Sequence, residues 1–280
     1  MTLPILTVVD LRKSFTLHGL GGQVIDSLHG VSLHLEEGEH VAIAGSSGAG
    51  KSSLLRCLIR NYLPDAGQVL LHSAGPAGGE TPPRSRPAAA VPAFAPESVP
   101  GGATIELTAL DDRSMARLRG REIGYVSQFL SAGPRNSPRQ HVLTSARRRG
   151  LEGTTAEQAV GEALTGLGLE EELWGVDCSV LSGGERQRVN LAAGIVSPPR
   201  LLLLDEPVSA LDPYNREKAL VMIERLASQG VSVLAVYHDM RIIRRVASRV
   251  LVMAKGRIVD EGTPGAVLEK HHAALEEAAA

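Results

Sequence analysis

The stretch VAIAGSSGAGKSSLLRCL, residues 41–58, decides the fold of this 280-residue chain. An apolar run at residues 41–44 leads directly into a glycine-rich loop at residues 45–52, which we call the phosphate loop, and helical spacing follows. The phosphate loop fits the pattern G-x-x-x-x-G-K-[ST] in full, between a strand and a helix as this motif requires. The alternative is a glycine-rich turn that happens to contain a lysine. The full pattern in this context predicts that the chain binds a nucleoside triphosphate.

The phosphate loop offers three kinds of group to a triphosphate. Its glycines allow backbone N–H groups to point inward around the phosphates, helped by the N-terminus of the following helix. Lys51 is expected to reach the β- and γ-phosphates, and the Ser52 hydroxyl is expected to ligate Mg²⁺. The residues predicted to bind the nucleotide here are Gly45, Ser46, Ser47, Gly48, Ala49, Gly50, Lys51, Ser52 and Ser53.

The segment LLLLDEP, residues 201–207, contains two acidic residues. A buried apolar strand that ends in Asp205 places a carboxylate beside the phosphate loop, where it can hold Mg²⁺ through water. Glu206 follows where the strand emerges and can accept a proton from an attacking water molecule. Taken alone, these residues also fit an Asp-Glu-Pro turn that caps the next helix. The phosphate loop upstream favours the catalytic interpretation.

Two further polar residues follow strand-like runs. His238, after VSVLAVY, can point at the same γ-phosphate, and Gln128, in IGYVSQFL, can contact the metal or the attacking water. A single His or Gln at a strand end is more often a surface residue that only makes hydrogen bonds. The functional interpretation therefore depends on the spacing of both residues relative to the other motifs. The predicted catalytic residues are thus Lys51, Gln128, Glu206 and His238. The remaining histidines have no ligand spacing with Cys or carboxylates, so we expect no transition-metal site.

The composition is that of an ordinary globular protein. The hydrophobic share is 43%, the charged share is 21% and the net charge is −2, so nothing indicates a nucleic-acid partner. Cys57 and Cys178 are the only cysteines and have no paired spacing, which favours a reducing compartment. The N-terminus lacks a signal-peptide pattern, and no apolar run approaches the roughly 20 residues that span a bilayer. We expect a cytoplasmic protein, peripheral to the inner membrane if it serves a transporter.

Strand and helix patterns alternate along the chain. Residues 24–44 alternate apolar and polar side chains around a Glu-Glu-Gly turn, which predicts a hairpin leading into the strand at 41–44. The runs LLLLD and VSVLAVYH, separated by a helical segment, predict a parallel sheet covered on both faces. Residues 249–262, RVLVMAKGRIVDEG, predict a closing hairpin.

Three segments depart from this alternation. Residues 74–102 contain seven prolines and five glycines without an apolar period, which favours a surface insertion over a functional lid. Residues 129–181 are helical and polar, with glycine interruptions. The tail after Lys270 is rich in Ala and Glu and is expected to fray.

The phosphate loop, Gln128, LSGGERQR at residues 181–188, LLLLDEP, SALD at residues 209–212 and His238, in this order, resemble the ATP-binding cassette (ABC) ATPases. The resemblance runs from about residue 6 to residue 266, apart from the proline-rich insertion. It implies one α/β domain of the P-loop NTPase type, with a parallel-sheet ATPase core, an N-terminal antiparallel β subdomain and an α-helical subdomain. The implied boundaries are a core at about 5–72, 104–128 and 182–266, an insertion at 74–102, a helical subdomain at about 129–196 and a frayed tail at 270–280.

The resemblance also implies a site shared between two chains. In this family the LSGG sequence, which we call the signature loop, closes over the γ-phosphate bound by the other chain of a head-to-tail dimer. Ser182, Gly183 and Gly184 would then contact the partner's nucleotide, Asp212 would bridge the two sites, and Phe15 would stack on the adenine. A Ser hydroxyl, backbone N–H groups and a helix N-terminus favour an anion. The alternative is a glycine turn that caps a helix in a monomer.

Several stretches resemble one subgroup more closely, the PhnL family of the bacterial carbon–phosphorus lyase machinery for phosphonate breakdown. They are SFTLH, RCLIRNYLPDAGQV, IGYVSQFL and LLLLDEPVSALDPYNR. This resemblance implies ATP and Mg²⁺ as cofactors and, as partner, the soluble carbon–phosphorus lyase complex that makes ribose 1-methylphosphonate 5-triphosphate. After SQFL, however, the sequence SAGPRNSPRQHV departs from the apolar run of that family, in the region where cassette ATPases meet their partners.

Two alternatives stay open. One is the ATPase of a membrane transporter, of a lipoprotein-release or phosphonate-importer type, whose partner is a membrane permease. The other is a non-transport cassette that acts on nucleic acid or ribosomes, with RSMARLRGRE and ARRRG as binding patches. Solvated charge on helices explains those patches better at a near-neutral net charge, and ribosomal members usually carry two cassettes per chain.

Overall fold

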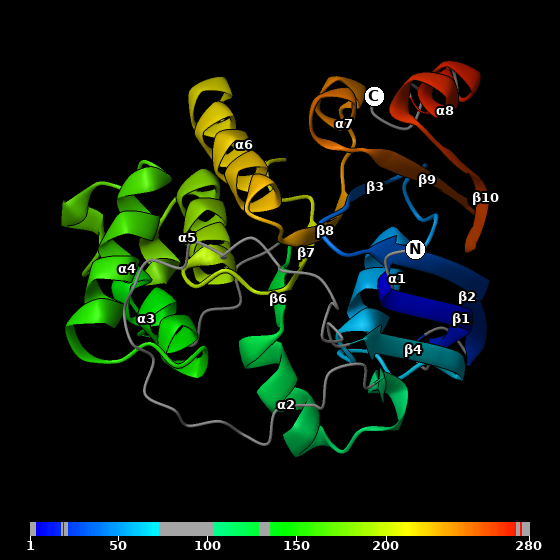
Figure 1. Cartoon of the computed structure of the whole chain (residues 1–280), viewed down its shortest axis with the longest axis horizontal. Coiled ribbons are helices and arrows are strands. Elements are labelled where there is room, and N and C mark those ends of the chain that lie inside the picture. The colour runs from blue at the N-terminus through cyan, green and yellow to red at the C-terminus, as the bar shows by residue number, and fades with distance from the viewer. Residues whose placement is uncertain are drawn as a thin grey trace, which may run out of the picture.

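The computed structural model of the chain describes residues 4–17, 19, 22–72, 104–128, 135–272 and 275 (Figure 1). The predicted insertion at 74–102 and the start of the predicted helical segment, residues 129–134, lie outside these ranges. Within the described ranges the chain forms two β-sheets with helices packed against them.

The smaller sheet has four strands in the order β2–β1–β4–β5 and is antiparallel throughout. The predicted hairpin over residues 24–44 is wrong, because β2 pairs with β1 while the strand after it belongs to the other sheet. Alternating side chains indicate which face of a strand is buried, but they do not identify the neighbouring strand. The strands are β1 (Pro4–Leu17), β2 (Gln23–Glu36), β4 (Ala66–His72) and β5 (Thr104–Glu106).

The larger sheet has six strands in the order β10–β9–β3–β8–β7–β6. Neighbouring strands from β9 to β6 run parallel, and β9 and β10 form the antiparallel hairpin predicted for residues 249–262. β3, β7 and β8 are buried along their whole length, as parallel strands covered on both faces are. The strands are β3 (His40–Ala44), β6 (Ile123–Val126), β7 (Leu201–Asp205), β8 (Ser232–Val236), β9 (Arg249–Ala254) and β10 (Arg257–Gly262).

Helix starts follow local capping chemistry. α3 and α5 each begin with a capping box, and α6 begins with an Asp cap followed by proline. α3, α4 and α5 pack against one another beside β6. The helices are α1 (Lys51–Leu58), α2 (Asp112–Arg121), α3 (Pro138–Arg148), α4 (Gly153–Gly166), α5 (Gly183–Ile195), α6 (Pro213–Ser228), α7 (Met240–Val246) and α8 (Pro264–Lys270). Short 3₁₀ helices are η2 (Leu107–Ala109), η3 (Glu171–Leu173) and η4 (Cys178–Val180).

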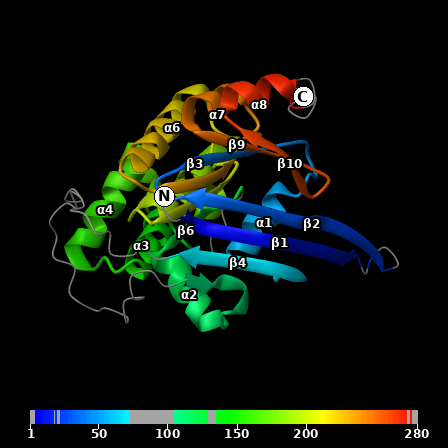
Figure 2. The same cartoon turned by 45° about the vertical axis from the view of Figure 1, so that its right-hand side comes forward.

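The larger sheet separates two hydrophobic cores. In β3, Val41 and Ile43 enter the core shared with α1, α2 and the smaller sheet, whereas Ala42 and Ala44 enter the core shared with helices α3 to α8. Figure 2 shows this layering, with β1, β2 and β4 on one side of β3 and β9, and α6, α7 and α8 on the other. The predicted α/β architecture, a parallel-sheet core with an antiparallel sheet and a helical group, is confirmed. Because the parallel strands end at one edge, the motifs that follow β3, β6, β7 and β8 meet there.

The chain packs against the body beyond α8. Of the predicted frayed tail, the structure describes Lys270, His271, His272 and Leu275. Leu275 is buried, and its N–H group donates to the carbonyl oxygen of His271 at 3.0 Å. At this residue the structure therefore differs from the prediction, because one apolar side chain a helical turn further on extends the buried face. None of the helices within the described ranges is both long and apolar enough to cross a bilayer.

Candidate functional site

The phosphate loop joins the end of β3 to the start of α1 in a conformation that requires glycine. Gly45 and Gly50 have φ angles of 146° and 98°, and a Cβ atom at Gly45 would overlap the carbonyl oxygen of Met253. α1 begins without a side-chain cap and without an acidic residue in its first turn. The N–H groups of that turn have no side-chain acceptor, so the residues present fit a bound phosphate.

Lys51 is buried, with 6% of its surface exposed, and its Nζ lies over the loop. It donates to the carbonyl oxygens of Gly45 at 2.7 Å and Ser46 at 2.8 Å. Burial lowers the pKa of Lys51, while the nearby charges of Glu206 and Asp205 oppose that shift. A cation held among loop carbonyls and facing two carboxylates is suited to contact phosphate oxygens.

Ser52 and Asp205 form a pair of oxygen ligands. The Ser52 hydroxyl donates to Asp205 Oδ1 at 2.8 Å, and the Tyr125 hydroxyl donates to Asp205 Oδ2 at 3.5 Å. Burial raises the pKa of Asp205, opposed by the bond from Ser52 and the charge of Arg56. Hydroxyl and carboxylate oxygens are ligands that Mg²⁺ accepts, and the described residues contain no group of three or more His, Cys, Asp or Glu that could hold a metal. A magnesium ion here would therefore need phosphate and water oxygens as well.

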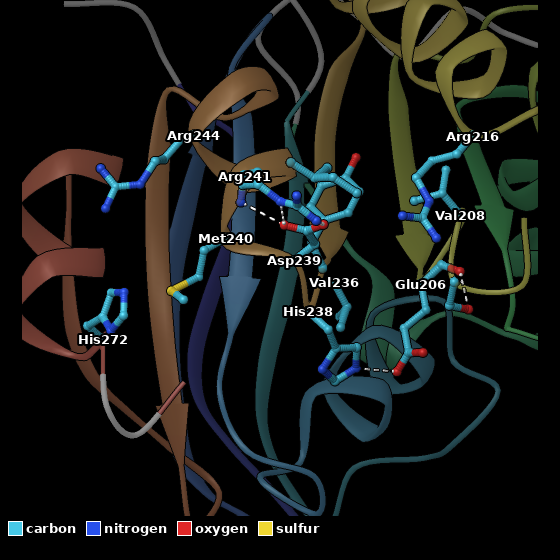
Figure 3. Close-up of a pocket in the computed structure, with 13 residues that line it drawn as sticks. Glu206, Val208, Arg216, Val236, His238, Asp239, Met240, Arg241, Arg244 and His272 are labelled. Carbon is cyan, nitrogen blue, oxygen red and sulfur yellow. Dashed lines mark hydrogen bonds and ion pairs between the residues drawn. The ribbon is translucent and has the colours of Figure 1, made fainter. Parts of the chain in front are cut away.

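Glu206 lies between His238 and Gln128. Its Oε1 is 2.7 Å from His238 Nε2 (Figure 3). Its Oε2 accepts from Gln128 Nε2 at 3.1 Å. The bond with His238 is the largest cause of a lowered pKa at Glu206, although burial opposes it. An ionised carboxylate at the end of β7 can accept a proton. Glu206 has a φ angle of 54°, a left-handed conformation that is rare without glycine and often found at active sites.

A cleft of about 820 Å³ opens beside this carboxylate (Figure 3). Glu206 and His238 line it, together with residues from the starts of α6 and α7, and no residue of the phosphate loop does so. On its wall, Asp239 accepts from Arg241 at 3.0 Å. The Glu206–His238 pair is therefore accessible from a side that the phosphate loop does not line.

Phe15 and Ser53 have partners other than the phosphate loop. The Phe15 ring meets Tyr62 edge to face, with 5.0 Å between ring centroids, and Lys13 Nζ lies 5.3 Å from the Phe15 centroid. Phe15 is only half-buried, so part of its ring is open to a ligand. The Ser53 hydroxyl accepts from Ser27 on β2 at 2.8 Å, which leaves its backbone N–H as its contribution toward an anion.

The signature loop, residues 181–184, is engaged with its own helix. The exposed Ser182 caps α5: its hydroxyl accepts from Glu185 N at 3.3 Å, and its N–H donates to Glu185 Oε2 at 2.7 Å. Asp212 similarly caps α6 by accepting from Tyr214 and Asn215. No hydrogen bond joins the signature loop to the phosphate loop, both of which lie in the described part of the chain. The structure thus brings Lys51 and Ser52 together with Gln128, Asp205, Glu206 and His238, but not with the signature loop.

Three residues of this site are absent from the sequence prediction. Tyr125 contacts Asp205, and Gln187 and Asn190 on α5 contact the main chain beside Glu206 and Gln128. The sequence does contain a signal for Gln187 and Asn190. They are polar residues three positions apart beside the apolar Val189 and Leu191, a pattern that predicts buried hydrogen bonds. Tyr125 has no such signal, since it lies in an ordinary strand pattern.

Comparisons with a protein family and with individual proteins give consistent matches. A protein-family model described as ABC transporter matches residues 28–209. The chain is 33% identical to the histidine transport ATP-binding protein HisP of Pseudomonas aeruginosa, over 94% of this chain and 92% of that protein. It is 31% identical to the methionine import ATP-binding protein MetN of Brucella abortus, over 92% of this chain and 60% of that protein. The chain thus spans less than two thirds of the length of that relative.

Two of the solved structures that are similar to this chain are dimers. The dimeric structure of MJ0796, a bacterial ABC transporter cassette, matches with a TM-score of 0.75 and 25% identity, over 92% of this chain and 98% of that one. A second dimeric structure, of the ATP-binding cassette MJ0796 in a post-hydrolysis state bound to ADP and Pi, matches with a TM-score of 0.74 and 25% identity, over the same shares of both chains.

Proposed function

Because the chain belongs to the ABC transporter family, we propose that it is the ATP-binding and ATP-hydrolysing subunit of a membrane importer of a small solute. The observation that carries the proposal is the convergence of Lys51, the Ser52–Asp205 pair and the Glu206–His238–Gln128 cluster at one sheet edge. Residues 1–280 would form a single cassette domain, with the core, insertion, helical subdomain and tail as the sequence predicts.

The proposal assigns a role to each residue of the site. Residues 45–53 surround the triphosphate, and Lys51 neutralises charge on its β- and γ-phosphates. Bound Mg²⁺ would draw charge from the phosphates and take oxygens of Ser52, Asp205 and Gln128. Glu206 accepts the proton of the attacking water, and Gln128 orients that water. His238 fixes the Glu206 carboxylate and faces the γ-phosphate, while Phe15 stacks on the adenine.

A second cassette chain completes the site. Ser182, Gly183 and Gly184 of one chain would contact the nucleotide of the other, and Asp212 would lie between the two sites. The exposure of Ser182 and the absence of a bond to its own phosphate loop support this arrangement. So does the dimeric MJ0796 cassette, whose fold this chain shares.

A membrane permease is the partner that the relatives favour. HisP and MetN are named as transport and import proteins, so we propose an amino acid or a solute of similar size as the cargo. The chain would then act at the cytoplasmic face of the membrane. The resemblance to the PhnL family, and with it the carbon–phosphorus lyase complex as partner, gains no support from these relatives and stays unconfirmed.

The substitution Glu206→Gln tests the hydrolytic assignment. We expect it to keep MgATP binding but to slow hydrolysis by at least about 10²-fold, the scale for losing a general base. It should also trap an ATP-bound dimer, visible as a doubled mass in light scattering. Turnover within threefold of the unsubstituted protein would rule out Glu206 as the base.

A pull-down from detergent-solubilised native membranes tests the importer assignment. With the Glu206→Gln chain as bait and ATP present, an integral membrane permease should be recovered in a defined ratio to the bait. The matched control is Lys51→Ala, which should not form the closed dimer. Recovery of a soluble carbon–phosphorus lyase complex in place of a permease would contradict the importer and support the alternative.

A further inference from the structure

α5 connects two parts of the molecule that the proposed function assigns to different nucleotides. Its N-terminal cap is Ser182, the residue proposed to contact the partner's ATP. Its buried face carries Gln187 and Asn190, polar side chains three residues apart that lie on the same side of the helix. Both point toward the chain's own hydrolytic cluster.

Gln187 holds the segment that contains Glu206. Only 2% of Gln187 is exposed, and its Nε2 donates to the carbonyl oxygen of Glu206 at 2.6 Å. Its Oε1 accepts from the N–H of Ala210 at 2.8 Å. One buried amide therefore satisfies main-chain groups at both ends of a turn whose first residue has the left-handed φ angle of 54°. Moving this side chain would remove two of the hydrogen bonds that hold the backbone of this turn.

Asn190 holds the other side of the cluster. It is 7% exposed, and its Nδ2 donates to the carbonyl oxygen of Ser127 at 2.6 Å and lies 3.3 Å from the Ser127 hydroxyl. Ser127 directly precedes Gln128, whose amide donates to Glu206 at 3.1 Å. The same face of α5 thus bonds to the backbone of Glu206 and to that of Ser127, the residue before its amide partner Gln128.

The second half of α5 packs too closely on the sheet to shift freely. A Cβ atom on Gly194 would overlap the side chain of Val126 on β6, and one on Gly124 would lie 3.0 Å from the carbonyl oxygen of Gly194. Such an approach between a helix and a strand leaves no room for sliding. The second half of α5 is therefore packed tightly against the end of β6.

We infer that α5 is a rigid coupling element between the two nucleotide sites, and that Gln187 and Asn190 are its positioning residues. When the partner's nucleotide engages Ser182, the position of α5 is set, and the two side chains transmit that position to Glu206 and Gln128 of the same chain. The inference rests on the proposed head-to-tail dimer. It adds which side chains carry the position of α5 to the hydrolytic groups, namely Gln187 to the turn of Glu206 and Asn190 to the residue before Gln128. A Hill coefficient for ATP above 1 reports whether the two sites are coupled through them.

The substitutions Gln187→Met and Asn190→Leu keep side-chain size and remove the hydrogen bonds. Each should lower kcat by about 10-fold or more, because small misplacements of reacting groups have large effects on rate. Each should also lower the Hill coefficient for ATP from above 1 to 1. KM and nucleotide affinity of the monomer should stay within twofold, and dimerisation should persist when either is combined with Glu206→Gln.

The matched control is Gln158→Met, the same change on the exposed side of α4, where Gln158 bonds only to Glu162. It should leave kcat and the Hill coefficient unchanged. If Gln187→Met fails to fold, Asn190→Leu carries the test alone. Normal kcat and cooperativity in folded variants would overturn the inference, as would a Hill coefficient of 1 in unsubstituted protein whose Glu206→Gln form dimerises. Failure of Glu206→Gln to dimerise would instead overturn the proposed dimer.

Discussion

The phosphate loop and the signature loop are both glycine-rich and both precede a helix, but they relate to the rest of the chain in opposite ways. In the phosphate loop, the left-handed backbone at Gly45 and its contact with Met253 require glycine within the chain itself. In the signature loop, a Cβ atom at Gly183 would meet nothing within 4 Å. A Cβ atom at Gly184 would lie 3.2 Å from the carbonyl oxygen of Ala210, so of these two glycines only Gly183 is free of such a contact within its own chain, which fits a surface that another molecule approaches closely.

The polar residues of the phosphate loop and of the signature loop also differ, in burial and in hydrogen bonding. Lys51 is buried and bonded to two loop carbonyls, and Ser52 is bonded to Asp205. Ser182 is exposed, its hydroxyl and N–H bond to Glu185, and its carbonyl oxygen accepts from the N–H of Arg186 in the same helix. The phosphate loop thus finds the partners of its polar side chains within its own chain. The signature loop acts only as a helix cap in the single chain, and we propose that it contacts a nucleotide only when a partner chain is present.

The largest expected effect separates the two sets of glycines. Gly45→Ala should destabilise the protein by about 3 kcal/mol or more, because the methyl group overlaps main chain in a left-handed conformation. Gly183→Ala should leave the melting temperature within about 1 °C, since the site is open and Ala favours helix. It should nevertheless abolish dimerisation of the Glu206→Gln protein. Thermal unfolding and light scattering measure the two outcomes, and equal destabilisation by both changes would break the comparison.

The second largest effect is expected when one loop is altered in one chain of the dimer and the other loop in the other chain. Lys51→Ala should lose nucleotide binding, and Ser182→Arg should keep binding as a monomer but block closure, so that each lowers hydrolysis by at least about 10²-fold. Mixed together, the two proteins should regain part of the activity, because one of the two composite sites then carries neither defect. A Ser182→Arg chain that stays monomeric with ATP and hydrolyses it normally would show that the signature loop is only a cap.

The smallest effect concerns the cap itself. Glu185→Ala removes half of the capping box and should lower stability by about 0.5 kcal/mol, or about 1 °C in melting temperature. The bond from the Ser182 N–H lowers the pKa of Glu185. A group whose pKa is depressed by folding contributes stability above its unfolded pKa and loses it as pH falls through the folded value. The difference in the free energy of unfolding between the variant and the unsubstituted protein should therefore be present at pH 7 and shrink as the pH falls below the ordinary pKa of a glutamate.

Much of the candidate site could be predicted because most of its functional residues lie in short sequence motifs. A strand, a glycine-rich loop and a helix that follow one another place Lys51 and Ser52 without reference to distant residues. Apolar strands ending in Asp205 and before His238 also predict the right edge of a parallel sheet. The hairpin over residues 24–44 was wrong because a strand's partner depends on which distant strand covers its edge, here β1.

The sequence by itself determined the phosphate loop, the identity of the acidic and polar residues around it, and the parallel sheet that holds them. Only the tertiary structure decided which of these groups touch, and that Gln187 and Asn190 bond to main-chain atoms 19 and 63 residues away in the chain. The physical reason is that the periodicity of side chains is local, whereas a buried amide has to find its partners across the packed interior. The same packing holds α5 to the backbone of Ser127 and Glu206 and leaves Ser182 exposed at the helix N-terminus.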